Sequence, residues 1–394
     1  MLYTKRSEPV LTSELFMSPT AEYRGAPFWA WNCKLEEAEL LRQIEIFKEM
    51  GLGGFHVHSR SGLATPYMGE EFLDLVAACN QKAIKEEMLC YLYDEDRWPS
   101  GAAGGEVTKD YEYRLRYLTI FPYGHPLPEV SGEPSQARYV PSGIRQHLAR
   151  FRVKLDGGYL AGYERLPLDQ IPQDTTMVWD AYLEVAGDSA WFNNQAYVDT
   201  LNKKAIDRFI ETTYDKYAAK LGEHFGKSIV SIFTDEPQFS HKQTLTSSDA
   251  KRIVTLPFTT DFDETYTCEY GESIIEFLPE LVWEKTTPSK ARYQYHDHIC
   301  ARFTEAFADN VGKWCEKNGI MLTGHMMHEE SLASQTLALG ETMRAYRSFQ
   351  LPGIDMLCDK REFSTAKQAQ SAVHQYGREG LLSELYGVTN WDFD

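Results

Sequence analysis

The feature that most constrains the fold is a repeated alternation of short apolar runs with segments of helical periodicity. Apolar runs at 27–32, 53–60 and 88–96 are separated by amphipathic segments at 35–51 and 70–87. In those segments apolar side chains recur every three or four residues, as on the buried face of a helix. Strands that alternate with helices build parallel sheets, because each helix returns the chain to the same edge of the sheet. The sequence therefore predicts an α/β fold.

The alternation stops at about residue 113 and resumes at about 191. Between these points, alternating polar and apolar runs separated by Gly- and Pro-containing turns predict a small antiparallel β insertion, with strands at 114–121, 149–155, 158–166 and 175–185. Later strands are predicted at 228–236, 319–328, 353–357 and 381–387. Residues 238–290 show no regular pattern, and we expect an irregular loop region there.

Seven β/α-type strands in this order fit a TIM-type (β/α)8 barrel. A dinucleotide-binding sheet has no support, since no GxGxxG follows the first strand. A closed barrel needs eight strands, so we expect the barrel to be incomplete in this chain and the sequence to stop before the eighth strand. Residues 1–112 would then form the first part of the barrel, 113–190 the insertion and 191–394 the remainder.

Composition argues against several classes of protein. The chain has 40 Lys and Arg against 58 Asp and Glu, a formal charge of −18, which disfavours nucleic acid or an anionic membrane surface as a partner. No apolar run is long enough to cross a bilayer, and the first residues lack the apolar core of a signal peptide. Seven scattered cysteines without a CxxC pair indicate reduced thiols, and we therefore expect a cytoplasmic protein.

Ionisable side chains gather where the predicted strands end. Asp235 and Glu236 end the fourth strand and Glu384 ends the seventh. Two carboxylates on opposite sides of a barrel mouth suit glycosidic cleavage, in which one protonates the leaving oxygen and the other activates water or attacks directly. Any single acid could instead cap the helix that follows it. The candidates for substrate binding are His56, His58, Arg60, Asp94, Trp98, Asp235, His325 and His328.

Seven motifs, in order, resemble glycoside hydrolase family 106, a group that contains α-L-rhamnosidases. They are APFWAWN, GGFHVHSRSGLATPYMGEEF, YLYDEDRWPSGAAGG, IFTDEPQF, GHMMHEESL, PGIDML and SELYG, spread over residues 25–112 and 195–390. The resemblance implies a TIM-barrel catalytic domain, a glycoside or oligosaccharide substrate, inverting hydrolysis and a calcium ion near the sugar. It also implies that Glu236 is the general acid and Glu384 the general base. No spacing in the sequence identifies the calcium ligands.

Two other classes of function remain open at this point. The pair His56 and His58 lies on one face of the second strand and, with His325, could hold a metal ion in a metal-dependent TIM-barrel hydrolase. The chain could also be a catalytically inactive barrel that binds carbohydrate without cleaving it.

Overall fold

A parallel sheet forms the frame of the molecule. The structure is a computed structural model, and it describes residues 10–125, 141–356 and 363–387. The seven strands of this sheet are hydrogen-bonded in sequence order, and every neighbouring pair is parallel. They are β1 (Phe28–Trp31), β2 (Gly54–Ser59), β3 (Leu89–Tyr93), β8 (Ile229–Asp235), β10 (Met321–His325), β11 (Leu351–Met356) and β12 (Leu382–Leu385). The predicted α/β fold with a parallel sheet is confirmed.

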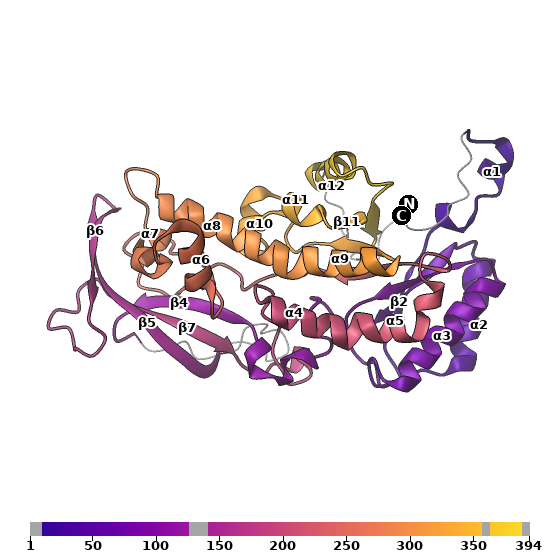
Figure 1. Cartoon of the computed structure of the whole chain (residues 1–394), viewed down its shortest axis with the longest axis horizontal. Helices are drawn as coiled ribbons and strands as arrows, with labels where there is room; N and C mark the ends of the chain where they lie inside the picture. The colour runs from indigo at the N-terminus through magenta and orange to yellow at the C-terminus, as the bar shows by residue number, and fades with distance from the viewer. Residues whose placement is uncertain (1–9, 126–140, 357–362, 388–394) are drawn as a thin grey trace, which may run out of the picture.

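Helices follow the strands along the chain (Figure 1). The longer ones are α2 (Glu37–Glu49), α3 (Glu70–Lys85) and α12 (Phe363–Gln375), and two composite helices in which a π-helical turn joins α4 (Lys203–Phe209) to α5 (Asp215–Leu221) and α8 (Lys290–Phe303) to α9 (Asp309–Asn318). Shorter ones include α1 (Ser13–Met17), α10 (Leu332–Ala338) and α11 (Thr342–Tyr346). No helix within the described residues is both long and apolar enough to cross a membrane.

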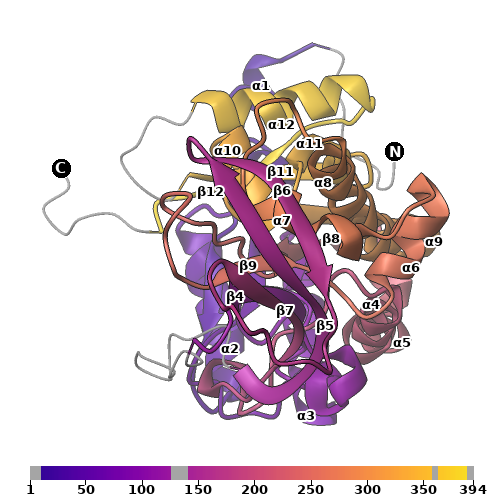
Figure 2. The same ribbon diagram turned by 90° about the vertical axis from the view of Figure 1, so that its left-hand side faces the viewer.

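A second, antiparallel sheet lies at the other end of the long axis, away from α2 and α3 (Figures 1 and 2). Its strands run in the order β6-β5-β7-β4-β9. Their bounds are β4 (Arg116–Pro122), β5 (Pro141–Asp156), β6 (Tyr159–Leu166), β7 (Val178–Ala186) and β9 (Val254–Pro257). The first four correspond to the four strands predicted between 113 and 190.

Residues 238–290 differ from the irregular loop region that the sequence predicted. They contain β9, α6 (Phe262–Tyr270) and α7 (Leu278–Val282). Strand β9 is only four residues long, and its pairing with β4 joins Thr119 to Thr255 across more than a hundred residues. A strand this short has little periodicity of its own, so its partner stabilises it and the local sequence does not reveal it. The antiparallel sheet therefore draws on residues on both sides of β8.

The two faces of β2 show how the parallel sheet is packed. Phe55 and Val57 are buried in the apolar core, and the Phe55 ring packs against Trp29 of β1 and Phe47 of α2. Because side chains alternate along a strand, His56 and His58 point to the opposite face.

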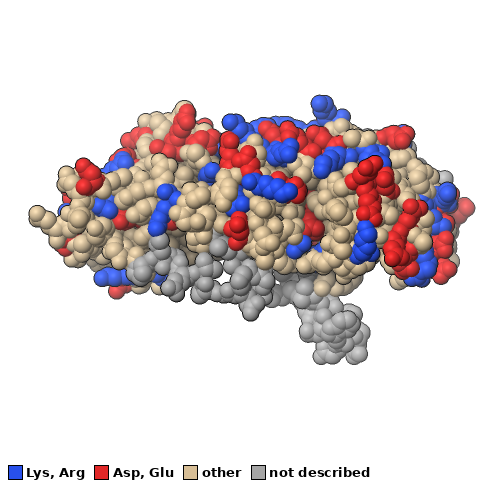
Figure 3. Space-filling model, turned by 90° about the horizontal axis from the view of Figure 1, so that it is seen from below, with Lys and Arg blue, Asp and Glu red and all other residues tan. Residues whose placement is uncertain are grey.

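On the outside of the molecule, acidic and basic side chains are interspersed on the face that Figure 3 shows. Lys34 and Glu71 form one of the exposed ion pairs of the molecule.

Candidate active site

Four ionisable side chains meet at the carboxyl ends of β8, β10, β11 and β12. Asp235 and His325 are register partners on the neighbouring strands β8 and β10. Asp355 and Glu384 are register partners on β11 and β12. Each strand is a run of largely apolar residues that ends on, or next to, one of these polar groups. Parallel alignment brings the ends to one edge, and we call these four residues the His325 cluster.

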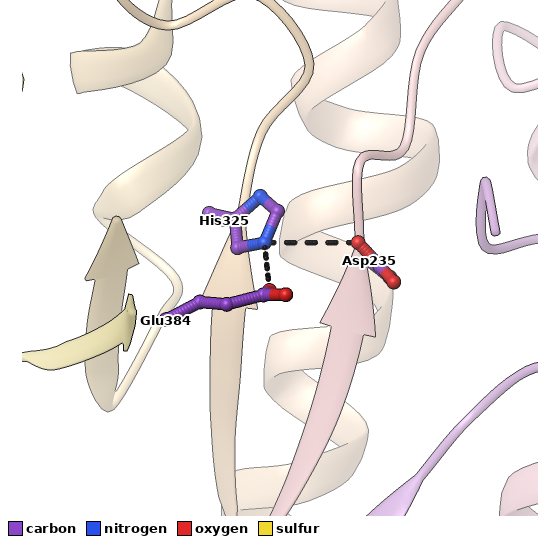
Figure 4. Close-up of side chains that lie close together, drawn as sticks. All are labelled: Asp235, His325 and Glu384. Carbon is purple, nitrogen blue, oxygen red and sulfur yellow. Dashed lines mark hydrogen bonds and ion pairs between the residues drawn. The ribbon is translucent and has the colours of Figure 1, made fainter. Parts of the chain in front are cut away.

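His325 is the centre of this cluster. Its Nε2 lies 2.8 Å from Oε2 of Glu384 and 3.7 Å from Oδ1 of Asp235. Dashed lines mark both contacts in Figure 4. The same nitrogen lies 3.9 Å from Oδ2 of Asp355. The imidazole is 1% exposed, so these contacts are shielded from solvent. Three carboxylates therefore share one buried ring nitrogen.

The electrostatics favour a protonated His325. Burial by itself lowers the pKa of this imidazole, but the hydrogen bond to Glu384 and the charges of Asp235 and Glu384 outweigh it, and the pKa lies well above its usual range. Burial raises the pKa of Asp235, and the positive charge of His325 opposes that rise. Burial also raises the pKa of Asp355 to about 7. The cluster is thus an imidazolium that compensates buried carboxylates.

Two further residues, which are not among the predicted site residues, hold the cluster in place. The Tyr93 hydroxyl donates to Oδ2 of Asp235 at 2.7 Å. The buried Glu329 carboxylate accepts the backbone N–H of Asp355 at 2.9 Å and the Tyr346 hydroxyl at 2.8 Å. Asp355 was missed as well, although an acid at the end of the predicted strand 353–357 was a usable signal. Glu329 carried a similar signal, because it comes directly after the predicted strand 319–328.

Glu236, the predicted general acid, follows Asp235 directly. It is half-buried and adopts a left-handed backbone conformation with φ of 46°. Glu384, the predicted base, is also half-buried and contacts His325. The roles of both glutamates and the separation of their carboxyl groups stay predictions.

The structure places His56 and His58 in a buried aromatic layer, and their contact with substrate stays a prediction. They are 3% and 2% exposed. The His56 ring stacks on Tyr91 with centroids 4.6 Å apart, and the His58 ring lies 3.9 Å from that of Tyr93. Phe28 contacts both imidazoles. Burial lowers the pKa of His56 to about 4 and that of His58 well below its usual range, so both rings are neutral.

Asp94 is enclosed by protein. One of its oxygens accepts the Ser100 hydroxyl at 2.5 Å and the other the Tyr214 hydroxyl at 2.6 Å, and the residue is fully buried. Burial raises its pKa to about 7. These contacts hold both Asp94 oxygens within the protein, and the substrate-binding role expected for Asp94 stays a prediction.

The remaining predicted residues are more accessible. The Arg60 guanidinium lies 4.7 Å above the Trp98 ring. Burial raises the pKa of Asp235, and the charge of Arg60 is one of the contributions that oppose this rise. The structure thus brings Arg60 and Trp98 together beside the cluster. His328, in contrast, points to Glu330 at 3.5 Å and lies beside the ring of His241.

The cluster has the residue types of a metal site but does not match calcium. Ligand atoms of Asp235, His325 and Glu384 lie within 4.8 Å of one another. Calcium takes six to eight oxygen ligands, whereas this set places an imidazole nitrogen at its centre. One imidazole and two carboxylates suit zinc or a similar metal better. Any calcium ion would need ligands other than this set.

Comparisons with known proteins show the fold alone. No protein-family model matches the chain, and no curated protein matches it in sequence. Among solved structures, a rhamnosidase from Novosphingobium sp. PP1Y is similar, with a TM-score of 0.62 and 12% sequence identity. The match covers 94% of this chain and 52% of the rhamnosidase. The chain therefore has a fold like that of this rhamnosidase, and it spans about half the rhamnosidase's length.

Proposed function

We propose that this chain carries the catalytic site of a glycoside hydrolase, similar to the α-L-rhamnosidases of glycoside hydrolase family 106. The observation that supports it best is the convergence of carboxylates from β8, β11 and β12 on His325 at one end of the sheet. The rhamnosidase-like fold and the motif resemblance point to the same class of substrate, a glycoside or oligosaccharide.

The parallel sheet is proposed to be the larger part of a (β/α)8 barrel. Glu384 on β12 reaches His325 on β10 although β11 lies between the two strands. In a flat sheet, strands two places apart are separated by about 9.5 Å. The contact therefore favours a sheet that curves toward this face, as a barrel does.

The proposed reaction is an inverting hydrolysis. Glu236 donates a proton to the glycosidic oxygen, so that the aglycone leaves as an alcohol. Glu384 removes a proton from a water molecule, whose oxygen attacks the anomeric carbon from the opposite face of the sugar. His325, held by Asp235 and Asp355, orients the Glu384 carboxylate through the contact with its Oε2. For this mechanism we expect carboxyl groups roughly 6.5–9.5 Å apart.

Turnover of a natural-type α-L-rhamnoside by Glu236→Gln and Glu384→Gln tests this assignment in the full-length protein. General acid–base help contributes about 10²–10⁴-fold, so each change should lower kcat by that order while the fold is kept. Asp74→Asn, in an exposed ion pair with Lys220 on the helical surface, is the matched control and should turn over normally. Wild-type protein that cleaves no rhamnoside or other glycoside would instead favour a barrel that binds carbohydrate without cleaving it.

A metal-dependent hydrolase is a second candidate because Asp235, His325 and Glu384 form a compact set of metal-ligating side chains. The histidine pair expected to bind such a metal, His56 and His58, lies in the aromatic layer instead. Elemental analysis of the purified protein separates the candidates. One zinc per chain that is lost in Glu384→Gln would support the metal-dependent reaction. Calcium dependence without zinc would support the calcium ion that the family resemblance implies.

A further inference from the structure

Glu236 adopts a backbone conformation that its neighbours must enforce. Its φ of 46° lies in the left-handed region. For a residue with a side chain this costs about 1–2 kcal/mol, and such a conformation persists only where the surrounding structure fixes it. The conformation determines where the Glu236 carboxyl points, so whatever enforces it also aims the proposed acid.

Ser100 forms hydrogen bonds with both backbone groups of Asp235, the residue before Glu236. The Ser100 hydroxyl oxygen accepts the N–H of Asp235 at 2.8 Å, and the N–H of Ser100 donates to the C=O of Asp235 at 2.8 Å. That carbonyl and the Glu236 nitrogen belong to one planar peptide unit. The two hydrogen bonds therefore fix the orientation of the Asp235–Glu236 peptide plane, relative to which the φ rotation of Glu236 is defined.

The Ser100 hydroxyl has a second, simultaneous bond. It donates to Oδ1 of Asp94, whose other oxygen accepts the Tyr214 hydroxyl. Ser100 is fully buried, so these bonds do not compete with water. One side chain thus links the end of β3 to the end of β8.

The loop that carries Ser100 is itself anchored. The buried Glu95 carboxylate accepts backbone N–H groups from the residues just after Ser100, at 3.0 Å from Gly101 and 2.8 Å from Ala102 and Ala103. The Ser100 carbonyl accepts the Tyr197 hydroxyl at 2.7 Å. A loop tied down at this many points can impose strain on the peptide it holds.

We propose that Ser100 is a positioning residue that holds the Asp235–Glu236 peptide and thereby aims the Glu236 carboxyl at the glycosidic oxygen. This inference rests on the proposed function of Glu236 as general acid. The hydroxyl is required as donor and acceptor at once, which alanine cannot replace and threonine can.

The test measures kcat for a series of aryl glycosides whose phenols span a range of pKa. Leaving groups of high pKa need protonation by the acid, whereas activated ones do not. Ser100→Ala should lower kcat by about 10–100-fold for poor leaving groups, the size expected for a misplacement of about 1 Å, and by less than about threefold for the best. Ser100→Thr should restore most of the loss. Thr259→Val, which removes another buried hydroxyl that bonds a buried carboxylate, Asp199, is the matched control and should leave the leaving-group dependence unchanged.

Two outcomes separate this inference from the proposed function. If Glu236→Gln shows the leaving-group dependence but Ser100→Ala slows all substrates equally, Ser100 is only structural and the inference is wrong. If Glu236→Gln itself shows no such dependence, Glu236 is not the acid and the proposed function fails. Should Ser100→Ala not fold, Tyr197→Phe tests the same loop through the Ser100 carbonyl. It should produce a weaker version of the same pattern, and an equal loss for all leaving groups would again overturn the inference.

Discussion

Two halves of the parallel sheet use histidine in opposite ways. In β1–β3, His56 has Phe28 and Tyr91 as its register partners and lies in an aromatic layer. In β8–β12, His325 has Asp235 as its register partner and contacts three carboxylates. Both histidines are almost completely buried. The local sequence of a strand thus does not decide whether a buried imidazole is neutral or charged, because the neighbouring strands do.

The largest expected difference between the halves is in turnover. Glu384→Gln in the charged half should lower kcat by about 10²–10⁴-fold, the usual contribution of a general base. His56→Phe in the aromatic half keeps ring packing and should change kcat by less than about tenfold. Steady-state kinetics on one α-L-rhamnoside measures both. Equal losses would mean that the aromatic half also takes part in the reaction.

The next largest difference is in stability. His325→Leu removes the positive partner of buried carboxylates and should lower the free energy of unfolding by about 3–5 kcal/mol. His58→Phe replaces a neutral ring by one of similar volume among Phe28 and Tyr93, and should change it by less than about 1.5 kcal/mol. Urea unfolding of the full-length variants compares the two. A larger loss of unfolding free energy in His58→Phe than in His325→Leu would contradict the contrast between the charged and the aromatic half.

The pH dependence of stability sharpens the same contrast. The pKa of His325 is raised on folding and that of Asp355 is raised to about 7, so the folded state binds more protons than the unfolded state. The stabilisation that these two groups contribute is complete at low pH and is lost as the pH rises. The loss runs from about pH 4 to 7 for Asp355 and from about pH 6.5 upward for His325. For each group the free energy of unfolding falls by at most about 1.4 kcal/mol per pH unit.

Thermal unfolding of wild type and variants between pH 7 and 9 measures this effect. His325→Leu should flatten the fall in Tm, whereas His58→Phe should leave it unchanged, since a histidine with a lowered pKa is neutral over this range in both states. A wild-type Tm that is already flat across this range, and that His325→Leu leaves flat, would show that His325 is neutral when folded.

The smallest effect is expected where the two halves meet. Arg60, just after β2, lies over Trp98 and near Asp235. If the pair contributes to sugar binding, Arg60→Gln should raise KM about two- to fivefold with little change in kcat, as the loss of about 0.5–1 kcal/mol at a partly exposed cation–π contact implies. A change confined to kcat would place Arg60 in the chemistry instead.

The sequence predicted the order of the parallel strands and the residues at their ends. It did not predict how deeply several of the polar side chains are buried. Apolar runs located all seven parallel strands, and strand ends identified Asp235, His325 and Glu384 before their convergence was known. Periodicity gave the correct face of His56 and His58 but could not show that Phe28, Tyr91 and Tyr93 fill the space beside them. Strand β9 and the bond between Tyr93 and Asp235 depend on contacts far apart in sequence, which no local pattern encodes.

The stereochemistry of hydrolysis tests the central claim most directly. Proton NMR can follow the first minutes of cleavage of an aryl α-L-rhamnoside by the full-length protein, before the released sugar interconverts in solution. An inverting reaction with Glu236 as acid and Glu384 as base should release β-L-rhamnose first and then show the α-anomer as mutarotation proceeds. First release of the α-anomer would contradict this account, because it would require a covalent intermediate and two carboxyl groups only about 5–5.5 Å apart.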